Sequence, residues 1–230
     1  MPVLGLFYVG TGVECPVCRR RYRKFMPYGY TTPRENALCP SCLALERHRL
    51  MWLYLKHETD FFTVPARLLH VAPEYCFLKR FDRLPGLDYM TADLESPLAR
   101  VKMDIQAIPF DDGYFDIIFC NHILEHVGDD RLAMREMYRV MRSGGWGIML
   151  SPVNMAREVT FEDASVTDPA ERERLFGQKD HLRDYGRDYG RRLAEAGFIV
   201  DEIDYAALLS PELVRLFGLR NEIIYKVRKP

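Results

Sequence analysis

Residues 115–151 read FDIIFCNHILEHVGDDRLAMREMYRVMRSGGWGIMLS, and this stretch decides the fold. It contains two short apolar runs, 115–120 and 145–151, which are typical of buried strands. Between them the pattern predicts a helix over 129–142, because two aspartates suit its positive N-terminal end and two glycines lie just beyond its other end. A strand, a helix and a second strand in this order are typical of a parallel sheet covered by helices.

The same alternation continues on both sides of this stretch. Residues 43–58 (LALERHRLMWLYLKHE) have apolar residues at the spacing of one helix. We predict an α/β fold with a doubly wound, mostly parallel seven-stranded sheet and a small N-terminal module, divided as 1–46 (module), 47–65 (linking helix) and 66–230 (sheet domain). The other predicted strands are 67–72, 86–92, 100–105, 198–204 and 221–228, and the other predicted helices are 74–83 and 187–196.

The totals describe an ordinary globular chain. The 230 residues are 48% hydrophobic and carry a net charge of -1, which gives no global electrostatic reason to expect nucleic acid or a membrane as partner. The N-terminal MPVLGLFYVG has no basic segment and no small-residue cleavage site, so we expect no signal peptide. No apolar run reaches the ~18 residues of a membrane span. We therefore expect a cytoplasmic protein, where paired cysteines more often bind metal than form disulfides.

Four of the six cysteines form two matching turns, Cys15-Pro-Val-Cys18 and Cys39-Pro-Ser-Cys42, with twenty residues between them. Two sulfurs of each turn can reach one ion, so the four complete the tetrahedral shell of a structural Zn²⁺. The alternative is two redox dithiols or free thiols, but a thioredoxin-like pair needs a βαβ setting that this Pro-, Gly- and Arg-rich segment lacks. We predict a zinc ribbon with a structural Zn²⁺.

The ribbon is basic and contains several aromatic residues. Residues 1–50 hold eight Arg or Lys and three Glu, and the segment RRRYRKFMPYGY (19–30) lies between the cysteine pairs. Such a segment could bind single-stranded nucleic acid by phosphate contacts and stacking. We favour the alternative, a solvated basic hairpin whose aromatic residues pack the small zinc core, because a short module needs its few aromatics for burial.

Residues 101–153 carry a family resemblance. The steps Asp-x-x-x-x-Pro-Phe, Phe-Asp-x-Ile, Leu-Glu-His and Arg-x-Gly-Gly occur there in order, and the stretch resembles the central block of class I S-adenosylmethionine-dependent methyltransferases of the type-11 kind. The resemblance covers about residues 66–228, and 167–198 are similar to the stretch before strand six of many such enzymes. The ribbon followed by LERHRL resembles a bacterial subgroup. The resemblance implies a Rossmann-like methyltransferase domain with S-adenosyl-L-methionine as cofactor.

The first predicted cofactor stretch departs from the family pattern. Where the family has an acidic residue and three glycines, this chain has His70, Ala72, Glu74 and Cys76. A carboxylate at this turn disfavours a nucleotide pyrophosphate, which needs the positive helix end, but can pair with the cationic methionine part of S-adenosylmethionine. The alternative is that Glu74 only caps its own helix. We predict His70, Ala72 and Glu74 as cofactor-binding.

The remaining cofactor residues are predicted at three later strand ends. Asp93 follows His70 by 23 residues, close to the ~20-residue offset of a ribose-binding acid. The resemblance implies that Asp104 and Ile105 meet the adenine ring, and that Asn121 meets the methionine part.

The catalytic prediction rests on histidines beside these strand ends. A general base is needed only when the acceptor must lose a proton. The candidates are His122, His126 and His181, of which we rank His122 and His181 first, because their loops border the acceptor side in the family.

The predicted function is S-adenosylmethionine-dependent methyl transfer to a small-molecule or glycan-type acceptor, with the zinc ribbon shaping or covering the acceptor pocket. One alternative is a zinc-ribbon RNA- or protein-binding module with a degenerate cofactor site. Another is an RNA methyltransferase, which a net charge near zero disfavours.

Overall fold

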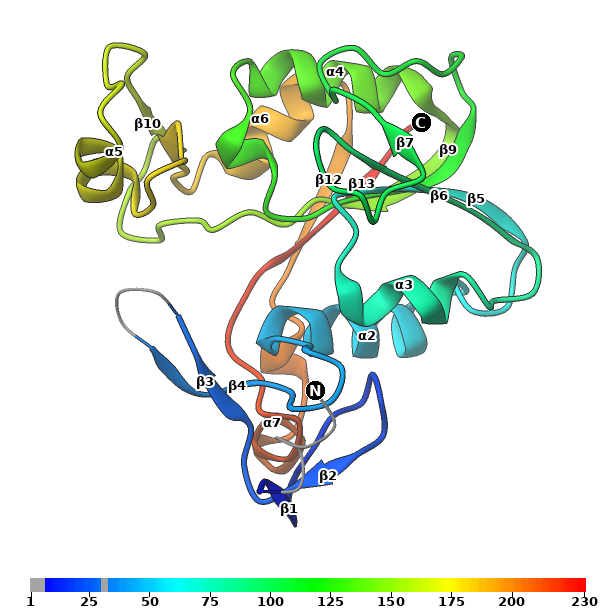
Figure 1. Cartoon of the computed structure of the whole chain (residues 1–230). Coiled ribbons are helices and arrows are strands. Elements are labelled where there is room, and N and C mark those ends of the chain that lie inside the picture. Colours follow the sequence, from blue (N-terminus) through cyan, green and yellow to red (C-terminus); the bar gives the residue numbers. More distant parts are fainter. Residues whose placement is uncertain (1–6, 30–32) are drawn as a thin grey trace. The chain divides into compact units, whose positions relative to one another are not determined.

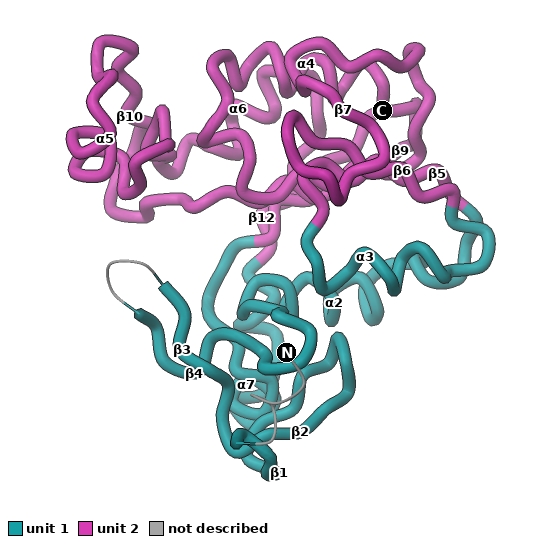
Figure 2. The backbone as a smooth tube through the Cα atoms, viewed as in Figure 1, with its two compact units in different colours: residues 1–65, 74–87, 204–223 teal, residues 66–73, 88–203, 224–230 magenta. Residues whose placement is uncertain are grey.

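The computed structural model describes residues 7–29 and 33–230 (Figure 1). The chain forms two compact units (Figure 2). Unit 1 comprises Met1–Pro65, Glu74–Leu87 and Asp204–Ile223, and unit 2 comprises Ala66–Pro73, Asp88–Ile203 and Ile224–Pro230. This division differs from the bounds expected from the sequence, because two later segments of the chain belong to unit 1.

Unit 2 is built on a seven-stranded sheet of order β12-β13-β9-β8-β5-β6-β7. The pairs β5/β8, β8/β9 and β6/β7 are parallel, whereas β13 runs antiparallel to both β9 and β12. The predicted fold, a mostly parallel seven-stranded methyltransferase sheet, is confirmed. The strands are β5 (Ala66–Val71), β6 (Leu87–Asp93), β7 (Val101–Lys102), β8 (Phe115–Cys120), β9 (Met141–Ile148), β12 (Ile199–Ile203) and β13 (Ile224–Arg228).

The register aligns the carboxyl ends of the central strands. Val71 at the end of β5 pairs with Cys120 at the end of β8. The Ala72 N–H donates to the Ala92 carbonyl (2.8 Å), which joins the turn after β5 to the end of β6. The predicted ligand stretches at these strand ends therefore share one edge of the sheet, the edge where open α/β sheets bind ligands.

Helices α4 (Asp130–Val140) and α6 (Tyr189–Glu195) lie side by side over the sheet of unit 2 (Figure 1). The N-cap of α4 is Asp129, whose side chain accepts from the Leu132 N–H, and its apolar face is fully buried. The helix ends at Val140, earlier than the expected bound of 142. The reason is a bulge in β9: Met141 already pairs with Phe115, and the next paired residue is Trp146.

The segment between β9 and α6 is an insertion that contributes residues to the site described below. It holds β10 (Phe161–Glu162), α5 (Pro169–Phe176) and β11 (Arg183–Asp184), and it faces the 3-10 helix η1 (Leu124–His126). Helix α5 was not expected, although it starts with Asp168 as N-cap followed by proline and ends at Gly177 with φ 90°. These local signals were sufficient to predict it.

A buried ion cluster attaches this insertion to α4. Arg192 donates to both oxygens of Asp130 (2.9 Å each), and the Tyr185 hydroxyl donates to the same carboxylate (2.7 Å). Glu162 accepts from Arg183 (3.0 Å) and from Arg192. Burial alone would raise the pKa of Asp130, but these hydrogen bonds and the nearby guanidinium charges hold it below its usual value.

Unit 1 combines two small hairpins with helices from distant parts of the chain. Trp52 of α2 stacks on Phe77 and Phe81 of α3, each with ring centroids 6.1 Å apart. Residues 74–83, expected to cover the main sheet, thus contribute to the core of unit 1. The elements are β1 (Val9–Glu14), β2 (Arg21–Tyr22), β3 (Met26–Tyr28), β4 (Arg34–Leu38), α2 (Glu46–Glu58), α3 (Tyr75–Phe81), η2 (Ala206–Leu208) and α7 (Pro211–Phe217).

Candidate functional site

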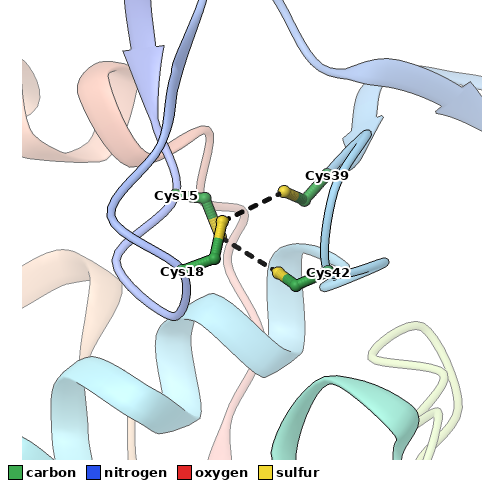
Figure 3. Close-up of side chains that lie close together, drawn as sticks. All are labelled: Cys15, Cys18, Cys39 and Cys42. Atoms are coloured by element: carbon green, nitrogen blue, oxygen red, sulfur yellow. Dashed lines mark hydrogen bonds between the residues drawn. The ribbon is translucent and has the colours of Figure 1, made fainter. Parts of the chain in front are cut away.

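The four predicted metal ligands Cys15, Cys18, Cys39 and Cys42 converge in unit 1 (Figure 3). The sulfur atoms of Cys15 and Cys42 lie 3.6 Å apart, and those of Cys18 and Cys39 lie 3.7 Å apart. A tetrahedral zinc ion with bonds of about 2.3 Å holds its sulfurs about 3.8 Å apart, whereas a disulfide needs about 2.05 Å. The cluster is compatible with a Cys₄ zinc site.

The two cysteine turns have the same backbone geometry. In each, the residue after the second cysteine has a left-handed conformation, with φ 59° at Arg19 and 62° at Leu43. The N–H groups of these residues donate to the carbonyls of Cys15 (2.7 Å) and Cys39 (3.0 Å). Matching turns present both sulfur pairs in the same way, as a shared ion requires.

Each cysteine turn is held by an arginine from a helix. Arg80 of α3 donates to the Val17 carbonyl within the first turn (2.7 Å). Arg49 of α2, fully buried, donates to the carbonyls flanking the second turn, those of Ala37 (2.7 Å) and Ala44 (2.8 Å). Arg49 also donates to the carbonyls of Phe217, the last residue of α7, and of Gly218, its C-cap. Its guanidinium lies 4.0 Å from the centre of the Phe25 ring. The segment LERHRL (45–50) contains Arg49 and therefore supports the ribbon directly.

The basic residues of the ribbon are largely paired within unit 1. Arg21 bonds Glu14 (2.8 Å), and Lys24 bonds Glu35 (3.3 Å). Arg34 donates to the buried Glu46 through two nitrogens. The ribbon aromatics Tyr22 and Phe25 are buried. These contacts favour the interpretation of a packed hairpin over an open phosphate-binding surface.

In unit 2, the predicted cofactor turn keeps a glycine-like backbone at Ala72. This residue has φ 45°, a conformation that glycine adopts without strain. His70 precedes it in β5, fully buried, with Nδ1 2.9 Å from the Tyr89 hydroxyl. The cofactor contact predicted for His70 stays a prediction.

Glu74 belongs to unit 1, where it is the N-cap residue of α3. Its side chain makes no capping hydrogen bond to that helix. The carboxylate instead lies 3.9 Å from Nε2 of His48 on α2. The side chain therefore gives α3 no capping hydrogen bond, and both the helix-dipole alternative and the role of Glu74 toward a cofactor stay predictions.

The other predicted cofactor residues follow β6, β7 and β8 in unit 2. Asp93 ends β6 and accepts from two backbone N–H groups of the next turn (2.8 and 2.7 Å). Asp104 is exposed and accepts from the Gln106 N–H (2.8 Å), while Ile105 beside it is buried. Asn121 is buried and accepts from the Leu150 N–H (3.3 Å). Each turn is ordered by its own polar side chain.

His122 follows β8 in a strained conformation, with φ 56°. Its N–H donates to the Leu150 carbonyl (2.8 Å), and its Nδ1 lies 3.5 Å from Oε1 of Glu125. Left-handed backbone at a residue other than glycine is often found at functional sites, because the strain must be held by its surroundings.

Glu125 was not predicted as a site residue, although it is the acid of the Leu-Glu-His step. It is buried, and its Oε2 accepts from the hydroxyl of Ser151, which follows β9 (2.7 Å). Burial alone would raise the pKa of Glu125, but the contact with His122 and the Ser151 hydroxyl hold it below its usual value.

The second predicted catalytic residue, His181, also lies close to Glu125. Its ring packs edge-on against His126, with centroids 4.8 Å apart, and Glu125, His126 and His181 form a cluster. Burial lowers the pKa of His181. The structure thus brings His122 and His181 to one carboxylate.

The comparisons with known proteins agree with this fold. Residues 74–149 match the family model described as "Methyltransferase domain". This part of the chain is similar to that family, and the recognition of a methyltransferase domain made from the sequence is confirmed.

The curated relatives match over short stretches. Ajmaline N-methyltransferase of Rauvolfia serpentina is 35% identical over 79 residues, 34% of this chain and 26% of that protein. An uncharacterised 37.1 kDa protein of a Streptomyces fradiae transposon is 29% identical over 115 residues, 46% of this chain and 31% of that protein. The chain thus spans about a third or less of the length of these relatives.

Solved structures share the fold at low sequence identity. The [4+2]-cyclase SpnF superposes with a TM-score of 0.55 at 16% identity, over 81% of this chain and 83% of that one. A chain from the complex of the Haloferax volcanii Trm112 methyltransferase activator with a methyltransferase superposes with a TM-score of 0.52 at 14% identity. The match covers 78% of this chain and 90% of that one. Among the described residues, no helix has both the length and the apolar character to cross a membrane.

Proposed function

We propose that this chain transfers the methyl group of S-adenosylmethionine to a small-molecule or glycan-type acceptor. One observation carries the proposal: the chain has a methyltransferase sheet, and predicted ligand residues from three strand ends lie along its carboxyl edge. The local similarity to ajmaline N-methyltransferase supports an acceptor of low molecular weight.

The residues at this edge suit the parts of the cofactor. Asp93 is the proposed ligand of the ribose hydroxyls, because a carboxylate at the end of β6 accepts two hydrogen bonds from a diol. Asp104 and Ile105 would bind the adenine amino group and ring face. Ala72 supports the fit, since its positive φ keeps the backbone path that a close approach to a ligand requires. His70 and Asn121 complete the proposed set in unit 2.

The bound cofactor would supply a methyl group activated by a sulfonium leaving group. The chain's own residues would align the acceptor in line with that group and exclude water, which is the main requirement of such a displacement. His122 and His181 are the proposed acceptor-side residues. The contact of His122 Nδ1 with Glu125 would orient the His122 ring on the acceptor side.

The cysteine cluster is proposed to bind one structural Zn²⁺. Four thiolate ligands leave no open coordination position, so the ion would stabilise unit 1 and take no part in the reaction. A reduced Cys₄ site also fits the cytoplasm, where we propose that the protein acts.

The test is calorimetry of zinc-loaded, folded protein with S-adenosylmethionine and with S-adenosylhomocysteine. We expect Asp93→Asn to weaken both by about 10- to 100-fold, because charge-assisted hydrogen bonds contribute about 1.5–3 kcal/mol each and 1.4 kcal/mol is tenfold. The matched control is Asp88→Asn, at the exposed start of the same strand. Absence of binding by both ligands in the wild-type protein would contradict the proposal.

A further inference from the structure

We propose that Glu125, His126 and His181 bind a divalent transition-metal ion, at a second metal site in unit 2. One ligand atom from each residue lies within 4.8 Å of the other two. Two imidazoles and one carboxylate are a ligand set that first-row divalent ions such as Zn²⁺, Co²⁺ and Mn²⁺ accept. The proposal goes beyond methyl transfer and does not depend on cofactor binding.

The strongest observation is an unsatisfied nitrogen in the protein interior. Nδ1 of His181 lies 3.0 Å from the Phe176 carbonyl, so this nitrogen must carry the proton and donate. Nε2 then carries a lone pair. It is buried, and nothing in residues 7–29 or 33–230 hydrogen-bonds to it. A buried acceptor without a donor destabilises the folded protein, and an ion bound to Nε2 would remove this cost.

The neighbouring side chains orient the other two ligands in the same way. Nδ1 of His126 lies 3.3 Å from the Asp180 carboxylate, which leaves its Nε2 for an ion. Oε2 of Glu125 is held by the Ser151 hydroxyl at 2.7 Å. Carboxylates, carbonyls and hydroxyls that fix the far side of a ligand are the usual support of protein metal sites.

The backbone holds the two ligand-bearing segments together before any ion binds. The Leu182 N–H donates to the Glu125 carbonyl (2.8 Å). The Arg183 guanidinium donates to three carbonyls around η1, those of Leu124 (2.6 Å), Val127 (2.6 Å) and Gly128 (2.9 Å). These bonds fix the two segments on either side of the cluster, so ion binding would need little ordering of the chain.

The distances require only a small closure. A tetrahedral ion with bonds of about 2.0–2.1 Å holds its ligands about 3.4 Å apart. No separation in the cluster exceeds this by more than about 1.4 Å, a difference that small rotations of the ligand side chains can supply. Three protein ligands also leave at least one coordination position open, as in sites that bind water or an oxygen of a substrate.

The probe is Co²⁺, added to protein whose cysteine cluster is already loaded with zinc. Binding at the proposed site gives weak visible d–d absorption, whereas Co²⁺ in the cysteine cluster gives intense thiolate charge-transfer bands in the near ultraviolet. We expect one Co²⁺ per chain with d–d bands alone, confirmed by calorimetry.

The variants separate this site from other histidines. His181→Phe keeps a buried ring and removes the ligand, and we expect at least a hundredfold loss of Co²⁺ affinity. His126→Ala is the second ligand variant, at a partly exposed position that should not impair folding. Ser151→Ala should weaken binding by about 10- to 100-fold through Glu125. The exposed His57→Ala is the matched control and should bind as the wild type does.

Three results would overturn the proposal. They are no Co²⁺ binding by the wild-type protein, thiolate bands as the only signal, and binding unchanged in both His181→Phe and His126→Ala. Failure of cofactor binding would leave this site untouched, so the two proposals fail independently.

Discussion

Replacing Arg49 with methionine tests the support of the zinc ribbon most directly. Arg49 is fully buried and donates four hydrogen bonds of 2.6–2.8 Å, to the carbonyls of Ala37, Ala44, Phe217 and Gly218. Methionine fills similar volume without a charge or a donor. The substitution therefore isolates the guanidinium, which joins the second cysteine turn to the end of α7.

The expected loss follows from these bonds and from burial. A hydrogen bond from a charged donor contributes about 1.5–3 kcal/mol, but part of that gain offsets the desolvation of the guanidinium. That desolvation holds the pKa of Arg49 below its usual value. Breaking a buried charged interaction typically costs about 3–5 kcal/mol. We expect a loss of about 4 kcal/mol, which lowers the urea midpoint by about 2 M if m is about 2 kcal/mol/M.

The assay uses the distribution of the two tryptophans. Trp52 lies in unit 1 and Trp146 in unit 2, so a Trp146→Phe background makes fluorescence report on unit 1 alone. The matched control is Arg47→Met, on the same helix at a less buried position, which should cost less than about 1 kcal/mol. Arg49→Lys should fall between, because lysine keeps the charge but not the planar fork. A loss below about 1 kcal/mol in Arg49→Met would refute the reasoning.

Three further predictions concern metal, charge and backbone. Cys39→Ser, or a strong chelator, should remove zinc and unfold the ribbon, seen as lost zinc content and a lost Trp52 transition; an unchanged transition would contradict a structural ion. Asp130→Asn should cost about 3–5 kcal/mol at neutral pH. The pKa of Asp130 is lower in the folded protein than in the unfolded chain. Its contribution to the free energy of unfolding is therefore complete above the unfolded pKa of about 3.9 and is lost as the pH falls through the folded pKa. In urea melts at acid pH, the stabilities of the wild type and Asp130→Asn should converge. Ala72→Gly should stabilise unit 2 by about 0.5 kcal/mol. The relief of about 1–2 kcal/mol of backbone strain at φ 45° outweighs the cost of about 0.4–1 kcal/mol from the greater entropy of the unfolded chain. A clear destabilisation in thermal melts would count against this prediction.

The sheet and the cysteine cluster were predictable because their signals are local. The run 115–120 is apolar and became β8 with the predicted bounds. Two matching Cys-x-x-Cys turns carry their own geometry, so their convergence follows from spacing alone. Each of these predictions depends on residues close in sequence.

The remaining features depend on tertiary packing, which no local pattern reports. Residues 74–83 have the helical pattern expected after a first strand, but the aromatic residues of that helix pack against Trp52 in unit 1. Glu125 and His181 are more than fifty residues apart, and although His181 was predicted as a catalytic candidate, no local pattern places it beside Glu125. Their relation arises only when the insertion folds over η1.

The contacts of Arg49 also bear on how the protein is made. The carbonyls of α7 that it binds lie 168 and 169 residues later in the chain. At about 5–20 residues per second, a ribosome needs roughly ten to thirty seconds to synthesise that interval. During this time the cysteine turns are outside the ribosome while half of the acceptors of Arg49 do not yet exist. The ribbon is translated before α7, yet it is among the last parts of this chain to reach its final stability.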